Sequence, residues 1–191
     1  MTNNASHHFR GKGISNSGSG TVSVGGNINI GDPNNCLADL YLTDPRHDKE
    51  RIEKTKGGLL HDSYCWVLHH ADFLRWRDSL GGSLLWIKGD PGKGKTMLLC
   101  GIIDELKQTA NDTHLLSFFF CQTTDERLND ATAILRGLIY HLAIQRPSLL
   151  SHMEKEHEHK GKALFQDVNS WVALNEIFKI ILQDPSLPDT T

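Results

Sequence analysis

The chain has 191 residues, of which 38% are hydrophobic and 23% charged, with a formal net charge of −3. This length allows one domain with a sizeable core and an appendage, and the charge excludes the basic field typical of proteins that bind nucleic acid. The longest apolar runs, LLWI and LLSFFF, are too short to cross a bilayer, and the start MTNNASHHF lacks the apolar region of a secretory signal. We therefore expect a cytoplasmic protein that contacts neither nucleic acid nor membrane.

The first 35 residues differ from the rest of the chain, because they are rich in Gly, Asn and Ser and carry few large apolar side chains. Such a segment cannot bury enough surface to offset about 1–2 kcal/mol of backbone entropy for each ordered residue. Alone it should be disordered or only marginally ordered. We predict a separate leader over residues 1–35, with a boundary marked by Pro33 and the two Asn residues after it.

Within this leader, the stretch TVSVGGNINIGD alternates polar and β-branched residues on both sides of Gly25-Gly26. A three-residue loop, or an arc that folds two strands face to face, makes one apolar surface from Val22, Val24, Ile28 and Ile30 by pairing Val24 with Ile28. Two strands alone are marginal in water, and neither proline nor charge blunts their edges. We predict that the stretch becomes ordered by stacking on copies of itself or on a matching partner segment; the alternative is a flexible linker.

Residues 36–82 are expected to be helical and to precede the main domain. A short helix is predicted from about Pro45 to Lys54, ending near Gly57-Gly58. A longer helix is predicted over residues 62–80, where apolar residues recur every three or four positions. Gly81-Gly82 then ends this segment.

Residues 83–191 are expected to form an α/β domain. The apolar runs SLLWIKG, residues 83–89, and LLSFFFCQ, residues 115–122, are typical of buried parallel strands. Helices are expected after the motif GDPGKGKT, after Asn129-Asp130, over residues 148–160, and before Pro185. This order predicts a parallel sheet with flanking helices. Because only two strands are predicted, the sheet is expected to be incomplete.

The motif between the first strand and its helix matches the phosphate-binding pattern G-x-x-x-x-G-K-[ST] at every position. Its residues are Gly89, Asp90, Pro91, Gly92, Lys93, Gly94, Lys95 and Thr96. The glycines let the backbone N–H groups converge on phosphate oxygens, and the start of the helix adds its positive end. Lys95 is expected to reach the β- and γ-phosphates, and the Thr96 hydroxyl to bind Mg²⁺. The alternative is a glycine-rich turn that matches by chance.

Hydrolysis needs further groups, and the sequence offers few of them. An acidic residue at the end of a later strand usually helps to hold the magnesium, and Asp184 is the downstream candidate; the alternative is a helix C-terminus. Asp125 and Glu126 can contact magnesium or water, or else cap the next helix. Arg127 and Arg136 can contact a γ-phosphate, and surface positions are the alternative.

The four cysteines lack C-x-x-C spacing, which argues against a disulfide framework or a zinc site and favours a reducing compartment. Cys100 and Cys121 lie in apolar runs and are expected in the core. On one continuous helix, His61, Cys65 and His69 would recur every four residues, but the two histidines would lie about 12 Å apart along the axis. One metal ion could not easily bind all three, so a solvated or half-buried face is expected. A solvated helix face is also expected for His152, His157 and His159.

The run from Cys36 to about Asp184 resembles the N-terminal part of fungal NACHT-domain proteins, the NLR-like STAND NTPases. The resemblance rests on the sequence segments LYLTDPRHDKERIEKTKGGLLHDSY, LLWIKGDPGKGKTMLLCGIIDEL, FFFCQTTDERLNDATAILRGLIYHL and NEIFKIILQDPSL. The resemblance implies binding of ATP or GTP with Mg²⁺, slow turnover, and a nucleotide-controlled switch from closed monomer to open oligomer. By the same analogy, the segment TDPRHDKERIEKTKGG lies near the base and ribose.

Two further expectations follow from this resemblance. Family members continue into a strand that carries the Walker B acids, and this chain stops at Thr191 before such a strand, so we expect a truncated domain with weak or absent hydrolysis. Residues 7–31 resemble the short amyloid-forming motifs, HET-s-related or sigma-type, at the N-termini of such fungal proteins. These motifs template the same fold in a downstream effector.

Together these observations predict a leader over residues 1–35, a helical segment over 36–82 and part of a nucleotide-binding domain over 83–191. The function expected is a nucleotide-binding signalling protein of fungal innate immunity or heterokaryon incompatibility. It would form a homo-oligomer and template a cell-death effector through the leader. The alternatives are a free-standing small P-loop NTPase or kinase, and a non-catalytic adaptor with a vestigial nucleotide site.

Overall fold

The computed structural model describes residues 13–16, 22–25, 33–79, 82–109, 114–123 and 125–187. Its α-helices are α1 (Pro33–Leu40), α2 (Pro45–Thr55), α3 (Cys65–Leu68), α4 (Ala71–Arg77), α5 (Lys95–Thr109), α6 (Ala131–Gln145), α7 (Ser151–Lys160), α8 (Ala163–Gln166) and α9 (Ser170–Leu182). Three short 3₁₀ helices are η1 (His61–Ser63), η2 (Glu126–Leu128) and η3 (Pro147–Leu150). None of the described helices is long and apolar enough to cross a membrane.

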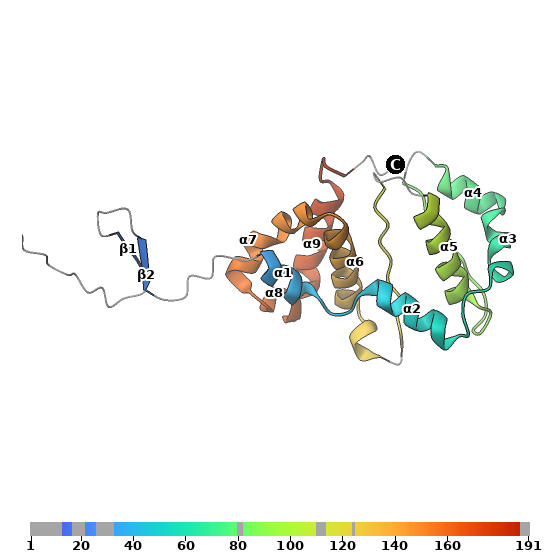
Figure 1. Ribbon diagram of the computed structural model, residues 1–191, viewed down its shortest axis with the longest axis horizontal. Coiled ribbons are helices and arrows are strands. Elements are labelled where there is room, and N and C mark those ends of the chain that lie inside the picture. The colour runs from blue at the N-terminus through green and yellow to red at the C-terminus, as the bar shows by residue number, and fades with distance from the viewer. Residues whose placement is uncertain are drawn as a thin grey trace, which may run out of the picture.

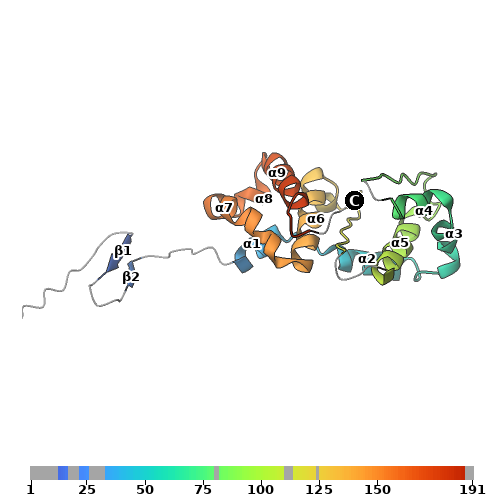
Figure 2. The same ribbon diagram turned by 90° about the horizontal axis from the view of Figure 1, so that it is seen from above.

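The α-helices form two groups, which Figures 1 and 2 show side by side. We call them the α6 group, which contains α1, α6, α7, α8 and α9, and the α5 group, which contains α3, α4 and α5. Helix α2 lies between the two groups and is held against α5 by an ion pair described below. The phosphate-loop motif belongs to the α5 group, because it leads directly into α5.

The α6 group has a deep core. Ile139, Met153, Leu174 and Ile181 are each 0% exposed, and Cys36 and Leu40 from α1 join the same cluster. The side chain of Arg136 is also buried here, and it donates to the carbonyls of Asp39, Leu40 and Tyr41 at 2.9 to 3.1 Å. Since the last carbonyls of a helix lack partners within it, Arg136 caps the end of α1. This contact fastens α1 to the other helices of the group.

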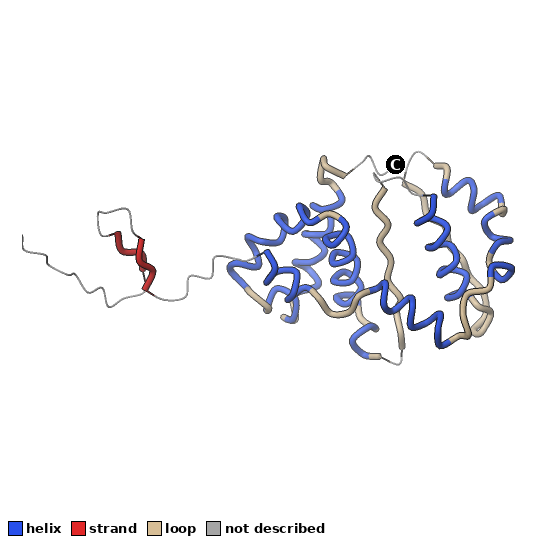
Figure 3. Tube along the Cα trace, viewed as in Figure 1, coloured by secondary structure: helices blue, strands red, loops and turns tan. Residues whose placement is uncertain are grey.

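The α5 group packs around two smaller clusters. One contains Phe73 of α4 and Val67 of α3 with the buried face of α5. The other contains Cys100 and Ile103 of α5 with Phe118 and Phe120 from the segment before η2. This segment runs between α5 and α6 as a loop (Figure 3). The loop therefore contributes buried side chains to the interior although it has no regular secondary structure.

The expectation of an α/β fold with a parallel sheet is wrong for the part of the chain that the structure describes. Residues 83–89 and 115–122 form no strand, and the strands assigned are the antiparallel pair β1 (Gly13–Asn16) and β2 (Val22–Gly25). An apolar run becomes a strand only where neighbouring backbone supplies hydrogen bonds, and periodicity cannot show whether such a neighbour exists. The first run is also exposed on one side, since Leu84 is 87% and Trp86 79% exposed.

The long helix predicted over residues 62–80 is also wrong. The segment is divided into η1, α3 and α4, and Asp62 lies inside η1. His70 is the N-cap of α4, where its side chain accepts from the Asp72 N–H. The first N–H groups of a helix have no partner within that helix, so a side chain that accepts from one of them favours a helix start. His70 plays this part, and a new helix therefore begins within a run of helical spacing.

The leader contains the β1–β2 hairpin, which Figure 1 shows apart from the helices. Its register pairs Val24 with Ile14 and Val22 with Asn16. The predicted pairing of Val24 with Ile28 involves a residue outside those that the structure describes. Gly26, Ile28 and Ile30 lie outside the described residues.

Candidate functional site

The predicted phosphate loop forms the turn that leads into α5. Gly92 and Gly94 both have a φ of +77°, a left-handed conformation that residues with a Cβ atom rarely adopt. A Cβ at either position would meet open space, so conformation rather than crowding requires glycine there. The Lys93 N–H donates to the Asp90 carbonyl at 3.4 Å and closes the turn. The two glycines thus stand where the backbone needs them.

Helix α5 begins at Lys95, and the Leu98 N–H donates to the Gly94 carbonyl at 2.9 Å. The first N–H groups of a helix have no partner within it and carry the positive end of its dipole. Lys95 Nζ donates to the carbonyls of Gly89 and Asp90 at 2.7 and 2.8 Å, which holds the ammonium over the loop. Thr96 is exposed beside it. A cation, a hydroxyl and first-turn N–H groups therefore lie at one surface.

A hollow of about 300 Å³ adjoins this loop. Its lining residues are Lys56, Gly58, Leu60, Ser63, Trp66, Lys93, Gly94, Met97 and Leu98. Lys56 and Lys93 make it electropositive, and Trp66, which is 56% exposed, offers an aromatic surface. The hollow therefore combines positive charge with apolar walls, as small-molecule sites commonly do.

A buried ion pair positions the wall of this hollow that follows α2. Lys49 is 6% exposed, and its Nζ lies 2.7 Å from Asp104 of α5 and 2.6 Å from Glu53. Burial lowers the pKa of Lys49, but the hydrogen bonds to Asp104 and Glu53 outweigh it and raise that pKa. The charged lysine therefore fastens α2 to α5 and sets where Lys56 follows.

The acidic residues predicted to hold magnesium make other contacts. Asp184 follows α9 in the α6 group, where it lies 2.5 Å from His152 Nε2 and accepts from the Ser186 N–H. Its hydrogen bonds to Ser186 and then His152 lower its pKa to about 2. Asp125 caps η2 and pairs with Arg127 at 2.8 Å. Glu126 is exposed within η2.

The two arginines predicted near a γ-phosphate have separate roles. Arg127 forms the exposed pair with Asp125, in agreement with the surface alternative. Arg136 is 7% exposed and caps α1, so neither the phosphate role nor the surface position describes it. Its apolar neighbours in the sequence contain no signal of that cap, because the carbonyls of Asp39, Leu40 and Tyr41 are more than 90 positions away.

The histidines and cysteines were only partly predicted. Cys100 is buried as expected, whereas Cys121 is exposed. His157 is buried rather than solvated, and its Nε2 lies 3.0 Å from Asp39. His159 is exposed as expected.

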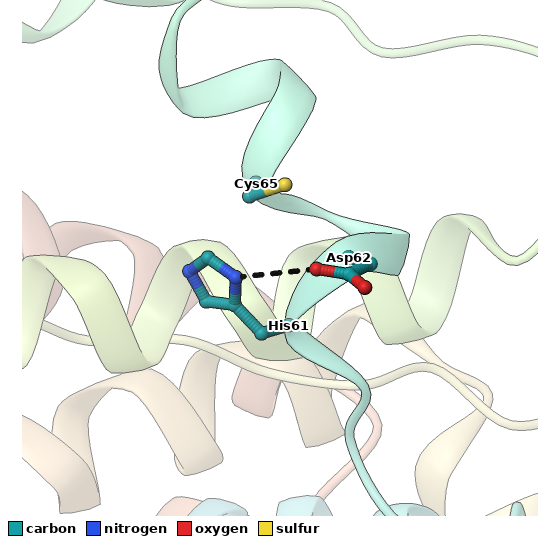
Figure 4. A group of neighbouring side chains, drawn as sticks. All are labelled: His61, Asp62 and Cys65. Carbon is teal, nitrogen blue, oxygen red and sulfur yellow. Dashed lines mark ion pairs between the residues drawn. The ribbon is translucent and has the colours of Figure 1, made fainter.

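The structure brings His61 and Cys65 together with Asp62, as Figure 4 shows. One ligand atom from each residue lies within 4.8 Å of the other two. His69 is not a member of this group; its Nδ1 instead lies 2.9 Å from the Cys65 carbonyl. The helical spacing could not reveal this arrangement, because η1 and α3 are separate elements.

Trp66, Leu60 and Met97 were not predicted as site residues. Their place around the hollow depends on how the segment after α2 returns to α5, which no local pattern specifies.

Comparison with known proteins identifies relatives of this chain. It is 62% identical over 158 residues to the vegetative incompatibility protein HET-E-1 of Podospora anserina, a match that covers 83% of this chain and 12% of that protein. No solved structure gives a significant match.

The match to a family model covers most of the part that contains the loop and the hollow. The family described as "Nephrocystin 3, N-terminal" matches residues 62–191. This range includes the phosphate-loop motif, α5 and all the helices from α4 to α9. The chain belongs to the nephrocystin 3 N-terminal family.

Proposed function

We propose that this chain binds ATP or GTP with Mg²⁺ at the loop Gly89–Thr96. The observation that carries the proposal is that three features meet at the start of α5: a turn with two left-handed glycines, the Lys95 ammonium over it, and the adjoining hollow. First-turn N–H groups and the helix dipole favour phosphate at such a position. The proposal needs only this local geometry and no sheet.

The lining of the hollow fits the remainder of a nucleotide. Lys56 and Lys93 suit the charge of a polyphosphate, and the ring of Trp66 can stack on a base. Thr96 is exposed next to Lys95, so its hydroxyl is available to a magnesium ion that accompanies the phosphates. In this proposal Lys56, Lys93 and Trp66 bind the nucleotide and take no part in a chemical reaction.

The direct test measures binding of fluorescent ATP and GTP analogues to the whole chain with Mg²⁺. Lys95→Ala should weaken binding about tenfold or more, because it removes the cation that faces the phosphates. Lys88→Ala is the matched control, since it deletes the same charge just outside the motif. Thr96→Ala should reduce affinity in Mg²⁺ and leave it unchanged in EDTA. Equal affinities for Lys95→Ala and Lys88→Ala would contradict the proposal.

We further propose that the protein acts in fungal incompatibility. The support is the 62% identity to a relative whose name states that role. Because the match covers 12% of that relative, the activity and partners of the longer protein come to this chain only as part of the proposal. In this role the bound nucleotide would control formation of a homo-oligomer.

The leader is the part proposed to contact an effector. The β1–β2 pair is a two-stranded sheet, so each strand has an outer edge whose backbone groups can pair with another chain. We propose that a matching segment of a second copy, or of an effector protein, adds to these edges. The proposed motif includes Val22, Val24, Gly25 and Gly26, with Ile28 and Ile30 after them.

Prolonged incubation of the whole chain tests this templating role. Fibres should give a cross-β reflection near ~4.7 Å. Val24→Pro should abolish them, because proline cannot donate to a strand ladder. Asn4→Pro, outside the alternating stretch, is the control and should leave them intact. A chain that stays monomeric at high concentration, with or without seeds, would rule out templating.

A further inference from the structure

We propose that His61, Asp62 and Cys65 bind one divalent cation of the zinc class. The three residues come from two adjacent elements, η1 and the start of α3, and offer an imidazole nitrogen, a carboxylate oxygen and a thiol sulfur (Figure 4). The proposal concerns a site separate from the phosphate loop. It stands whether or not the chain binds nucleotide.

The distances suit one ion. Donor atoms bound tetrahedrally at about 2.0–2.3 Å from zinc lie about 3.3–3.8 Å from one another. His61 Nδ1 is 3.8 Å from Asp62 Oδ1, and the three ligand atoms all lie within 4.8 Å of one another. Small rotations of the side chains therefore bring the set to tetrahedral spacing without moving the backbone.

The donor types select the metal. Thiolate and imidazole prefer zinc and neighbouring transition metals, whereas Mg²⁺ and Ca²⁺ prefer sets made of oxygen. Three protein ligands leave the fourth tetrahedral position for water or another small ligand. His61 and Asp62 are exposed, so an ion reaches the site directly from solvent.

The thiol of Cys65 is better suited to bind a metal ion than the thiols of the other three cysteines. Cys36 and Cys100 are buried, and burial raises the pKa of each thiol to about 11, which disfavours the thiolate that a metal needs. The exposed Cys121 is not part of any cluster of three metal ligands among the described residues. The His61 ring also packs edge-on against Tyr64, with centroids 5.3 Å apart, which restrains its orientation.

Titration of the metal-free chain with Co²⁺ and Zn²⁺ tests the site. One equivalent of Co²⁺ should give thiolate-to-cobalt charge-transfer absorption, and Zn²⁺ should displace it while Mg²⁺ should not. Cys65→Ser and His61→Ala should each weaken Zn²⁺ binding about tenfold or more, because each removes a direct ligand. Asp62→Asn should weaken it as well, and its side chain is too exposed to affect folding.

Two control variants locate the ion. Cys121→Ser removes an exposed thiol outside the group, and His69→Ala removes a nearby exposed histidine outside it. Both should bind Zn²⁺ as the original chain does. The proposal is overturned if no stoichiometric binding occurs, if binding survives Cys65→Ser and His61→Ala, or if either control loses it to the same extent.

Discussion

The α6 group and the α5 group show two ways of using apolar side chains. The α6 group encloses one large apolar cluster, in which Met153 and Leu174 are 0% exposed, although Trp171 and Val172 of α9 are 44% and 60% exposed. The α5 group encloses two smaller clusters, and Leu84 at 87% and Trp86 at 79% are more exposed still. The phosphate loop, the hollow and the His61–Asp62–Cys65 cluster all belong to the less enclosed group. We infer that the α6 group, with the larger core, contributes more to stability, whereas the α5 group supplies the surfaces proposed for binding.

The largest effect should come from opening the core of the α6 group. Leu174→Ala leaves a cavity in a closely packed interior and should lower the free energy of unfolding by about 2–5 kcal/mol. Leu84→Ala removes the same atoms from the surface of the α5 group and should change it by about 0.5 kcal/mol or less. Urea unfolding measures both variants. Similar losses would show that the two groups do not differ as described.

Acid should reveal a buried group at the boundary between the two groups. His141 of α6 is 3% exposed and meets the ring of Phe118 edge-on at 4.7 Å. Burial, with the positive charge of Lys107, lowers the pKa of His141 to about 4. The unfolded chain takes up this proton below its usual pKa of about 6.5, whereas the folded chain does so only near 4. Stability from this residue is therefore complete above pH 6.5 and is lost as the pH falls toward 4.

The loss from this one residue should reach roughly 3 kcal/mol at pH 4. His141→Met keeps a side chain of similar size and removes the titration. Urea unfolding at several pH values should show a smaller fall between pH 6.5 and 4 for this variant than for the original chain. If the free energy of unfolding fell equally with pH in His141→Met and in the original chain, the pKa of His141 would not differ between the folded and unfolded states.

A smaller loss than in the core or at His141 should come from two matched glycines. A Cβ on Gly101 of α5 would lie 2.2 Å from the ring of Tyr64, and one on Gly137 of α6 would lie 2.4 Å from the ring of Phe119. The ring must move in each case, and the cost of overpacking exceeds the helix propensity gained from alanine. Gly101→Ala and Gly137→Ala should therefore each lower the free energy of unfolding by about 1 kcal/mol.

The two variants should differ in binding. Along the chain, Tyr64 stands between the proposed metal ligands Asp62 and Cys65 and follows Ser63 of the hollow, so Gly101→Ala should weaken both Zn²⁺ and nucleotide binding. Gly137→Ala acts on the far side of the loop between α5 and α6 and should leave both unchanged. Thermal unfolding combined with the two binding assays measures this difference. If Gly101→Ala and Gly137→Ala weakened Zn²⁺ and nucleotide binding equally, a change in the α6 group would affect binding in the α5 group, which contradicts the prediction.

Local patterns in the sequence predicted several helices well. The helix expected from about Pro45 was confirmed as α2, and Asp130 was confirmed as the cap that begins α6. The apolar stripe before Pro185 was confirmed as α9. These features depend on residues close together in the chain, namely caps, proline and helical spacing. Helices α1 and α8 were missed, because both are short and their buried faces are completed by distant elements.

Neighbours along the chain were enough to place the glycine-rich motif of residues 89–96 and the main helices, because glycines, caps and helical spacing act locally. The tertiary structure makes residues 83–89 and 115–122 loops, because a strand there would need hydrogen-bond partners from distant segments of the chain. It also decided that Arg136 caps α1, and that Asp62 rather than His69 joins His61 and Cys65. In each case the partner is set by how segments return to one another in space, and one-dimensional spacing does not record that.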